Sequence, residues 1–236
     1  MKKVIAIIPA REGSKGVKNK NIKMLKDKPL ILYTIEEAKK SKLIDKLIVS
    51  TDSIEIAELS KNSGAEVPFI RPKDLSTDSS LTYDVVKHCL NFYKDKGEHF
   101  DIILLLQPTT PFRTVNTIDK SITILKNDSI YTSVVSVIDV EGNHPLRMKK
   151  IKDNLLVNYI DQGFENMNPR KELPKVFIRS GSIYAILTKH FYQEKSLVSK
   201  RCAPLILDKT ETINIDSLLD FMLCELILNE NYENSN

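Results

Sequence analysis

The opening strand Val4-Ile5-Ala6-Ile7-Ile8 and the loop that follows it decide the fold of this chain. These five residues are apolar and mostly β-branched, without polar alternation, which is typical of a strand buried on both faces of a parallel sheet. The loop is strongly basic: between Arg11 and Lys28 there are seven basic residues and two acidic ones. A solvated lysine-rich loop has the same composition. The position directly after a central strand favours a binding role instead.

Downstream of this loop, helical and strand patterns alternate as far as about residue 137. Repeated βαβ units of this length imply a doubly wound, mostly parallel sheet with right-handed crossovers. In such sheets ligands bind beyond the carboxyl ends of the strands. Helices are expected at residues 30–40, 54–61, 81–93 and 115–126; strands, besides 4–8, at 46–50, 101–106 and 131–137; and an extended segment at 65–70.

The alternation breaks at about residues 140–178, where short polar stretches contain Pro145, Pro169 and Pro174. We expect a β-hairpin excursion or a dimerisation arm there, within a single domain that spans residues 1–236. After it we expect returning strands at 183–187 and 204–207, and a closing amphipathic helix at 217–228 with Asp216 or Ser217 near its N-cap.

Composition and charge exclude several classes of protein. The chain has 236 residues, 42% hydrophobic and 28% charged, and a net charge of only +4, which does not indicate nucleic-acid binding. No apolar run reaches membrane-spanning length, and the first one ends too early, at Pro9, for a secretory signal. The three scattered cysteines fit neither a metal site nor a disulfide framework. We expect a cytoplasmic protein.

The basic loop has the chemistry that a triphosphate requires. Gly13 and Gly16 let backbone amides approach phosphate oxygens, Arg11 can bind these oxygens with two donors, and the lysines neutralise charge. The loop lacks the GxxxxGK[ST] spacing of P-loop proteins and the GxGxxG spacing of dinucleotide folds. It therefore indicates nucleotide phosphate binding by another architecture.

Two longer motifs stand out in the chain. The first is Ile8-Pro9-Ala10-Arg11-x-x-Ser14-Lys15-Gly16-x-x-x-Lys20-Asn21, and the second is Leu105-Leu106-Gln107-Pro108-Thr109-Thr110-Pro111-Phe112-Arg113-Thr114. They resemble the opening motif and the second motif of one family, the acylneuraminate cytidylyltransferases, which comprise the CMP-sialic acid synthetases and their legionaminic and pseudaminic acid relatives. Shorter matches run almost end to end: residues 49–52, 71–72, 144–147, 169–170, 173–174, 181–184 and 213–216.

The resemblance implies an α/β fold of the nucleotide-diphospho-sugar transferase, Rossmann-like type, with a small β-rich dimerisation excursion. It also implies a reaction. The enzyme would couple CMP from CTP to a nine-carbon 2-keto acidic sugar, such as sialic acid or legionaminic acid, and release pyrophosphate. A divalent metal, Mg²⁺, would assist, and the enzyme would act as a homodimer in the synthesis of a surface polysaccharide or glycan. The sequence does not say which nine-carbon sugar is used.

Carried over position by position, the resemblance implies three groups of site residues. Arg11, Ser14 and Lys15 would bind the phosphates of CTP, and Lys20 would bind the α-phosphate as the main catalytic residue. Asn21, Arg71 and Thr82 would surround the cytidine, although Thr82 replaces an expected serine. Gln107, Arg147 and Arg170 would face the acidic sugar, because an arginine suits its carboxylate.

Some of these positions have plainer interpretations. Arg71-Pro72 is also typical of a turn, and Gln107-Pro108 of a strand that ends, because proline cannot continue a central ladder. His144 has no second histidine or cysteine at ligand spacing, so we interpret it as structural.

The sequence departs from the family pattern most clearly at the metal site. Where the family often has Asp-x-Asp, this chain reads Asn214-Ile215-Asp216. An amide oxygen can bind Mg²⁺ but brings no negative charge, so metal affinity is expected to fall unless the triphosphate supplies most ligands. Asp216 could also act only as a helix cap. Arg179 lies one place later than in some members, and a one-residue shift turns a strand side chain to the other face.

Two rival functions stay open. The first is a cytidylyltransferase for the eight-carbon lipopolysaccharide sugar, although its usual Gln-Gly-Asp-Glu-Pro segment is absent here. The second is a non-catalytic CTP-binding protein, suggested by Asn214 and by the position of Arg179.

Overall fold

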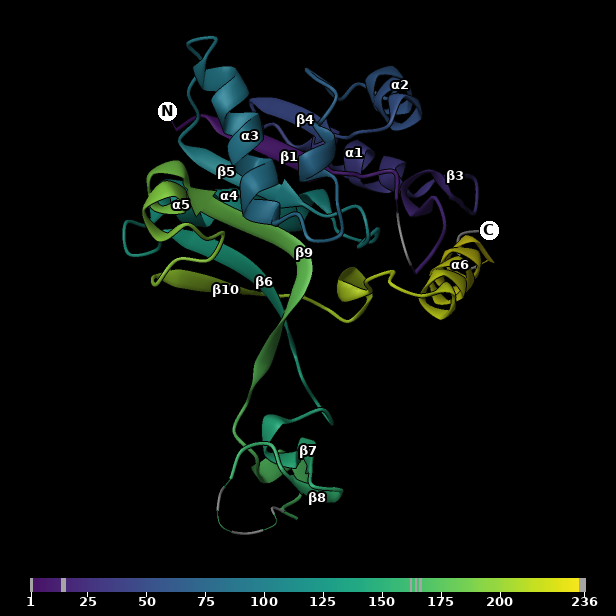
Figure 1. Ribbon diagram of the computed structural model, residues 1–236, viewed down its shortest axis with the longest axis vertical. Helices are drawn as coiled ribbons and strands as arrows, with labels where there is room; N and C mark the ends of the chain where they lie inside the picture. The colour runs from purple at the N-terminus through teal and green to yellow at the C-terminus, as the bar shows by residue number, and fades with distance from the viewer. Residues whose placement is uncertain (1, 14–15, 162, 164, 166, 234–236) are drawn as a thin grey trace.

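The computed structural model describes residues 2–13, 16–161, 163, 165 and 167–233. Its centre is a six-stranded sheet with the strand order β10-β6-β9-β5-β1-β4 (Figure 1). The strands are β1 (Val4–Pro9), β4 (Lys46–Ser50), β5 (Ile102–Leu106), β6 (Ser133–Asp139), β9 (Phe177–Leu187) and β10 (Cys202–Ile206). All neighbours pair in parallel except β9, which is antiparallel to both β5 and β6. The expected doubly wound, mostly parallel sheet is confirmed.

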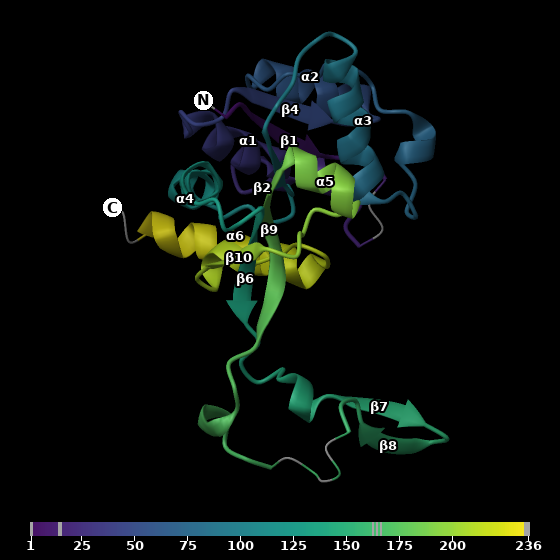
Figure 2. The ribbon, with the colours of Figure 1, turned by 90° about the vertical axis from the view of Figure 1, so that its left-hand side faces the viewer.

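Helices cover both faces of this sheet, as a side view shows (Figure 2). The helices are α1 (Leu30–Lys40), α2 (Ile54–Asn62), α3 (Thr82–Lys94), α4 (Val115–Asn127), α5 (Thr188–Glu194) and α6 (Leu218–Glu233). Alternate residues of β1 point to opposite faces: Ala6 and Ile8 pack in one core cluster with α1 and α4, whereas Ile5 and Ile7 pack in another with α3 and α5. Burial on both faces explains why the opening strand has no polar alternation.

Several local details differ from the sequence expectation. Helix α5 was not expected, and residues 65–70 join the sheet only through two isolated parallel bridges, Ile48 with Glu66 and Thr51 with Ile70. The basic loop contains a 3-10 turn, η1 (Lys20–Ile22), and a two-residue hairpin of β2 (Met24–Leu25) and β3 (Lys28–Pro29). These short elements arise from hydrogen bonds that leave no periodic pattern in the sequence.

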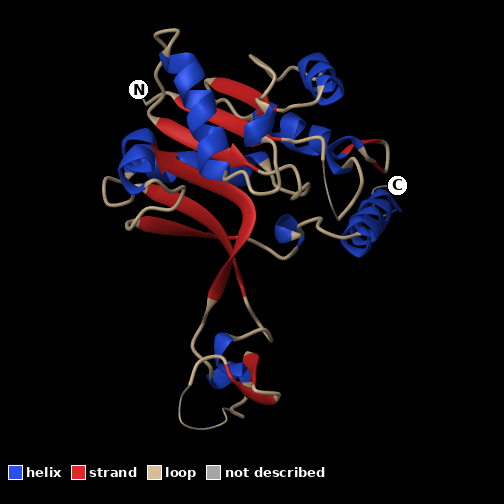
Figure 3. Ribbon diagram, in the orientation of Figure 1, coloured by secondary structure: helices blue, strands red, loops and turns tan. Residues whose placement is uncertain are grey.

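Between β6 and β9 the chain leaves the sheet and forms an arm, which we define as residues 140–176 (Figure 3). The last residues of β6 and the first of β9 pair with each other beyond the sheet and form the stalk of the arm. The arm contains the antiparallel hairpin of β7 (Lys149–Lys152) and β8 (Leu155–Asn158) and two 3-10 turns, η3 (Pro145–Arg147) and η4 (Arg170–Glu172).

Helix α6 begins with a reciprocal cap, which confirms Ser217 as the N-cap residue. The Asp220 carboxylate accepts hydrogen bonds from the backbone N–H and the hydroxyl of Ser217, and Ser217 Oγ accepts from the Asp220 N–H. The hydrogen bonds from Ser217 hold the pKa of Asp220 below its ordinary value. The same carboxylate accepts from the N–H of Asp216, so the cap also orders the segment that precedes the helix.

The expectation that the closing helix is amphipathic is wrong for this chain. Phe221 and Cys224 are buried against the rest of the protein, but the outer face of α6 is also apolar. It exposes Leu218, Leu219, Met222, Leu223 and Leu226. In the described part of the chain, no helix is both long enough and apolar enough to cross a bilayer.

Candidate active site

A pocket of about 480 Å³ opens at the carboxyl ends of β1 and β5. The chain moves from β1 to β4 on one side and to β5 on the other, so the strand order reverses here, which is where α/β sheets bind ligands. Of the predicted nucleotide residues, Arg11, Lys20, Asn21, Arg71 and Thr82 line the pocket. Gln107, Asn214 and Asp216 line it as well.

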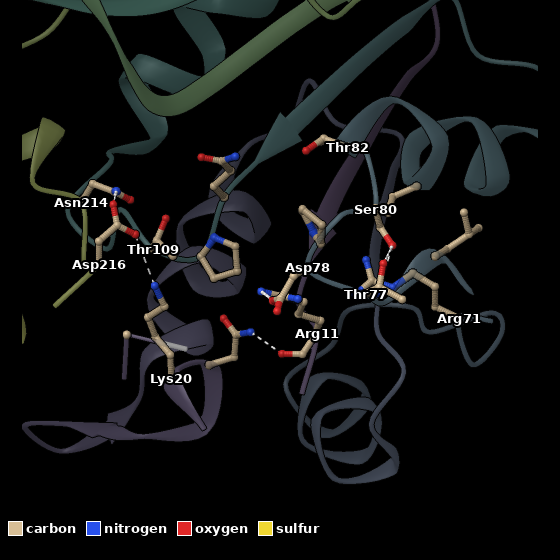
Figure 4. Close-up of a pocket in the computed structure, with 17 residues that line it drawn as sticks. Arg11, Lys20, Arg71, Thr77, Asp78, Ser80, Thr82, Thr109, Asn214 and Asp216 are labelled. Atoms are coloured by element: carbon tan, nitrogen blue, oxygen red, sulfur yellow. Dashed lines mark hydrogen bonds and ion pairs between the residues drawn. The ribbon is translucent and has the colours of Figure 1, made fainter. Parts of the chain in front are cut away.

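Lys20 joins two parts of the chain that are 195 residues apart in the sequence (Figure 4). Its ammonium group donates to the carbonyl oxygen of Ile215 at 2.5 Å and lies 3.4 Å from Asp216 Oδ1. Only 12% of its side chain is exposed, whereas 72% of the Asp216 side chain is. The lysine is therefore held at the pocket by a backbone carbonyl, and it does not depend on a buried ion pair.

Gly16 lies directly against the backbone of the segment before α6. A Cβ atom built on Gly16 would lie 1.9 Å from the carbonyl oxygen of Asp216, which is impossible without moving backbone. Thr109 also binds this segment, because its carbonyl oxygen accepts a hydrogen bond from the N–H of Ile215 at 2.8 Å. Two of the predicted motifs thus enclose Asn214-Ile215-Asp216.

Arg11 lines the pocket and pairs with an acidic residue that sequence reasoning missed. The Arg11 guanidinium lies 2.6 Å from Asp78 Oδ1. The backbone carbonyl oxygen of Arg11 accepts a hydrogen bond from Asn21 Nδ2 at 2.9 Å. The side chain of Asn21 thus fixes the course of the loop beneath Arg11. Ser14 and Lys15, the other predicted phosphate ligands, lie outside the described residues.

Arg71 is almost completely buried at the opposite side of the pocket (Figure 4). Its Nε donates to Ser76 Oγ at 3.1 Å, and its Nη2 lies 3.8 Å from Asp52. Burial lowers the pKa of Arg71, and the Asp52 carboxylate partly opposes this effect. These contacts hold the Arg71 side chain at the pocket, so Arg71 is not only a residue of an Arg-Pro turn.

The loop between Arg71 and Thr82 supplies pocket residues that sequence reasoning did not identify: Thr77, Asp78 and Ser80. Thr77 and Ser80 hydrogen-bond each other, and Ser80 Oγ donates to the Asp74 carbonyl oxygen. A signal was present, since the hydroxyl-rich stretch 76–80 lies between two predicted ligands.

The residues predicted to hold Mg²⁺ fit such an ion. The Asp216 carboxylate is exposed toward the pocket, and the Asn214 carboxamide touches it through an N–H donor. Rotation of that amide would turn its oxygen toward the same place. Within the described residues, no group of three or more His, Cys, Asp or Glu side chains forms a complete metal cage. One carboxylate and an amide oxygen suit Mg²⁺, which usually takes further ligands from substrate phosphates.

The predicted sugar residues are not all brought together. Gln107 follows β5 and lines the pocket, but Arg147 and Arg170 lie on the arm and do not line it. Arg147 donates to the Asn168 carbonyl oxygen at 2.7 Å, and Arg170 lies 3.5 Å from Glu141. Their assignment to the sugar stays a prediction. Arg179 also lies outside the pocket lining, at the exposed start of β9.

His144 has the structural role expected for it. Its Nδ1 accepts from the Leu146 N–H at 3.2 Å, and its Nε2 lies 3.0 Å from the Pro174 carbonyl oxygen. The ring thereby links the two ends of the arm, and no ring nitrogen is left for a metal.

The pocket is lined by the cationic side chains of Arg11 and Lys20 and by the carboxamide of Gln107. Arg11 and Lys20 lie where an anion could displace the carboxylates that now pair with them. Gln107 and Thr82 add neutral hydrogen-bonding groups. Such an arrangement suits a polyphosphate next to a second, polar substrate.

Comparison with known proteins gives a family. A family model described as cytidylyltransferase matches residues 5–214. The N-acylneuraminate cytidylyltransferase of Escherichia coli O18:K1:H7 is 35% identical over 94% of this chain, which spans only 51% of that protein. The CMP-N,N'-diacetyllegionaminic acid synthase of Legionella pneumophila is 36% identical, with 98% of both chains covered.

The fold has solved counterparts as well. A structure of CMP:2-keto-3-deoxy-manno-octonic acid synthetase complexed with CTP superposes with a TM-score of 0.70 and covers 97% of this chain and 99% of that one. Its sequence identity is 15%, so this likeness concerns the fold alone. The family match over residues 5–214, together with two relatives above 30% identity, places the chain by sequence. The chain belongs to the cytidylyltransferase family.

Proposed function

We propose that this chain is a single-domain enzyme that couples CMP from CTP to a nine-carbon 2-keto acidic sugar and releases pyrophosphate. The observation that carries the proposal is the meeting of Arg11, Lys20 and Asp216 in one pocket at the reversal of strand order. The names of the two relatives support a sugar of the sialic or legionaminic type. A cytoplasmic location and a role in glycan synthesis are part of the same proposal.

The proposed reaction is an in-line displacement at the α-phosphate of CTP. The anomeric oxygen of the sugar forms the new bond to the α-phosphorus and its proton passes to solvent, while the bond to the β-phosphate oxygen breaks and pyrophosphate leaves. Lys20 and Arg11 stabilise the charge that develops on the phosphates, and Arg71, Asn21 and Thr82 hold the cytidine side of the pocket. Mg²⁺ held by Asp216 and Asn214 would supply further neutralisation of the triphosphate.

We assign no side chain as general base. Among the described residues that line the pocket, Asp78 and Asp216 are the carboxylates, and each is paired with a cation. Catalysis would thus depend on positioning and charge stabilisation, without a covalent intermediate.

The assay that tests the proposal measures pyrophosphate release from CTP and Mg²⁺ by the purified protein. Sialic, legionaminic and pseudaminic acids are compared with the eight-carbon lipopolysaccharide sugar and a blank without sugar. Release with one nine-carbon acid supports the proposal and names the substrate. Release with the eight-carbon sugar alone would replace it with the first rival, and CTP binding without release would favour the non-catalytic one.

Substitution Asn214→Asp separates the enzyme from the non-catalytic rival. A second carboxylate beside Asp216 attracts Mg²⁺ more strongly, so the Mg²⁺ concentration for half-maximal rate should fall by roughly threefold to tenfold. Turnover should change by less than about threefold, because the triphosphate already supplies most ligands. Asn62→Asp, an exposed site at the end of α2, is the control for added charge. A gain in turnover of two orders of magnitude would identify the natural protein as impaired.

The enzyme is further proposed to act as a homodimer assembled through the arm. The arm exposes Ile151, Leu155, Leu156, Tyr159 and Met167, each between 60 and 82%. Apolar groups exposed in this way on a projecting arm favour association (Figure 1). Arg147 and Arg170 do not line the pocket of their own chain, so they would bind the sugar only in the pocket of a second copy.

The double substitution Leu155→Asp, Leu156→Asp should therefore convert a dimer to a monomer, as measured by light scattering. Charges in place of two exposed leucines oppose burial of the hairpin, because an unpaired buried carboxylate is strongly disfavoured. The matched control is Ile54→Asp, since Ile54 is 68% exposed at the start of α2. A monomeric wild-type protein would contradict the dimer proposal directly.

A further inference from the structure

The Gln107 side chain lies beside an irregular part of the neighbouring strand. Strand β5 ends at Leu106, which pairs with Ile183 of the antiparallel β9, so Gln107 lies next to residues 181 and 182. In the described part of the chain, no side chain or backbone group hydrogen-bonds the Gln107 carboxamide. Some other feature must orient it.

Gly181 is that feature. Its φ of +79° lies in the left-handed region that glycine adopts without strain. A Cβ atom built there would lie 2.9 Å from Gln107 Oε1, closer than such atoms normally approach. The end of the Gln107 carboxamide therefore occupies space that a side chain at residue 181 would need, and Gln107 lines the pocket from this position.

The conformation of Gly181 is imposed by a bulge in the sheet. The register of β6 against β9 shifts between Val135 and Val137. Ser136 fills the gap: its hydroxyl accepts from the Ile183 N–H at 2.8 Å and from Ser180 Oγ at 2.8 Å. Ser136 Oγ also donates to the Ile183 carbonyl oxygen at 3.1 Å. All of these groups are buried, so the bulge is fixed by side-chain hydrogen bonds.

Arg113 connects the backbone that carries Gln107 to strand β9. Its guanidinium is 1% exposed, and in the described structure no carboxylate lies within ion-pair distance of it. Nη2 donates to the carbonyl oxygens of Gln107 at 2.5 Å and of Ser182 at 2.9 Å, and so joins the end of β5 to the middle of β9. Burial lowers the pKa of Arg113 to about 9, so the group is still protonated at neutral pH.

A cation buried among neutral oxygens is costly, and a simple core position would not require one. What Arg113 provides is one nitrogen, Nη2, that donates to both carbonyl groups, while Nη1 donates to Thr34 Oγ1 at 2.7 Å and holds the planar group in place. It sets the distance between the backbone that carries Gln107 and the backbone that carries Gly181.

We propose that Gly181 and Arg113 are positioning residues for the sugar subsite, which orient the Gln107 carboxamide so that its NH₂ group donates to an acceptor oxygen of the sugar. Neither residue touches the sugar. The inference rests on the proposed function, because it takes Gln107 as a sugar ligand. It predicts that sugar recognition changes when Gly181 changes, while CTP binding does not.

The test compares Gly181→Ala with Gly97→Ala. Both glycines have a positive φ, +79° and +77°, but nothing lies within 4 Å of a Cβ atom built on Gly97. Both variants suffer the same backbone strain, of order 1–3 kcal/mol. Only Gly181→Ala should raise the KM for the sugar. The expected increase is about tenfold, which corresponds to the loss of one hydrogen bond, and the KM for CTP should stay within about twofold of wild type.

A double-mutant cycle then tests whether Gly181 acts through Gln107. In a Gln107→Ala background, Gly181→Ala should raise the sugar KM by less than about twofold more, because no carboxamide is left to displace. An equal increase in both backgrounds, or a parallel loss of CTP binding, would overturn the inference. Arg113→Lys keeps the charge but loses the planar group that Thr34 holds in place, and it should raise the sugar KM in the same selective way.

A crystal structure of Gly181→Ala gives a result that does not depend on turnover. We expect the Gln107 carboxamide to move away from residue 181 while the Gln107 Cα and the CTP side of the pocket stay in place. An unmoved carboxamide would overturn the inference even if the enzyme proved active. Absence of pyrophosphate release by the wild-type protein with every nine-carbon acid would instead overturn the proposed function.

Discussion

Replacing Lys20 with alanine is expected to lower the rate of pyrophosphate release about 10³-fold, which corresponds to about 4 kcal/mol of transition-state stabilisation. The ammonium group of Lys20 points into the pocket from a position fixed by the Ile215 carbonyl oxygen. Preorganised charge of this kind acts on the transition state without reorganisation. Rates are measured under saturating CTP and sugar, and CTP affinity is measured separately by calorimetry.

Lys18→Ala is the matched control for this experiment. Lys18 belongs to the same basic loop and is exposed, but it does not line the pocket. Its loss removes the same charge and should change the rate by less than about threefold, because exposed charges are screened. If Lys20→Ala kept more than a fifth of wild-type activity, the assignment of Lys20 to the α-phosphate would be wrong.

The second large effect is expected for Gly16→Ala. The new Cβ atom would lie 1.9 Å from the Asp216 carbonyl oxygen, so the basic loop and the segment 214–216 must separate. This separation displaces Lys20 and Asp216 together, and misplacement by about 1 Å can cost about 10²-fold in rate. The rate and the Mg²⁺ dependence should both change, while the circular dichroism of the sheet and helices stays that of wild type.

Gly13→Ala provides the comparison within the same loop. Nothing lies within 4 Å of a Cβ atom built on Gly13, and its φ is not in the left-handed region. It should therefore leave the contact between the basic loop and Asp216 in place and lose much less activity than Gly16→Ala. Equal losses in Gly13→Ala and Gly16→Ala would mean that the loop needs glycine for flexibility and not for the contact with Asp216.

The helices and parallel strands could be predicted because each buries a face with its own period. Helix α1 begins and ends at the residues expected from its apolar spacing, and β4 matches residues 46–50. Strand β9 was expected only in part, and nothing in its sequence showed that it runs antiparallel. A strand buried on both faces has the same apolar pattern in either direction.

The exposed outer face of α6 is a feature that the sequence pattern did not predict. Leu219, Met222 and Leu226 belong to an apolar helix in the sequence, and an amphipathic packing was the natural expectation. Whether a face is covered depends on which element packs against it, and helical spacing does not contain that information. The structure places these residues at the surface of the chain.

The sequence by itself determined the parallel α/β core and the basic loop after the first strand, because local period carries these features. The family resemblance of its motifs predicted eight of the seventeen residues that line the pocket. Only the tertiary structure decided that Asp78 pairs with Arg11 and that Gly16 touches the Asp216 backbone. It alone showed that Arg113 joins Gln107 to Ser182 and that Arg147 and Arg170 stay outside the pocket. These relations connect residues distant in sequence, and the packing of the sheet, not any local pattern, brings such residues together or keeps them apart.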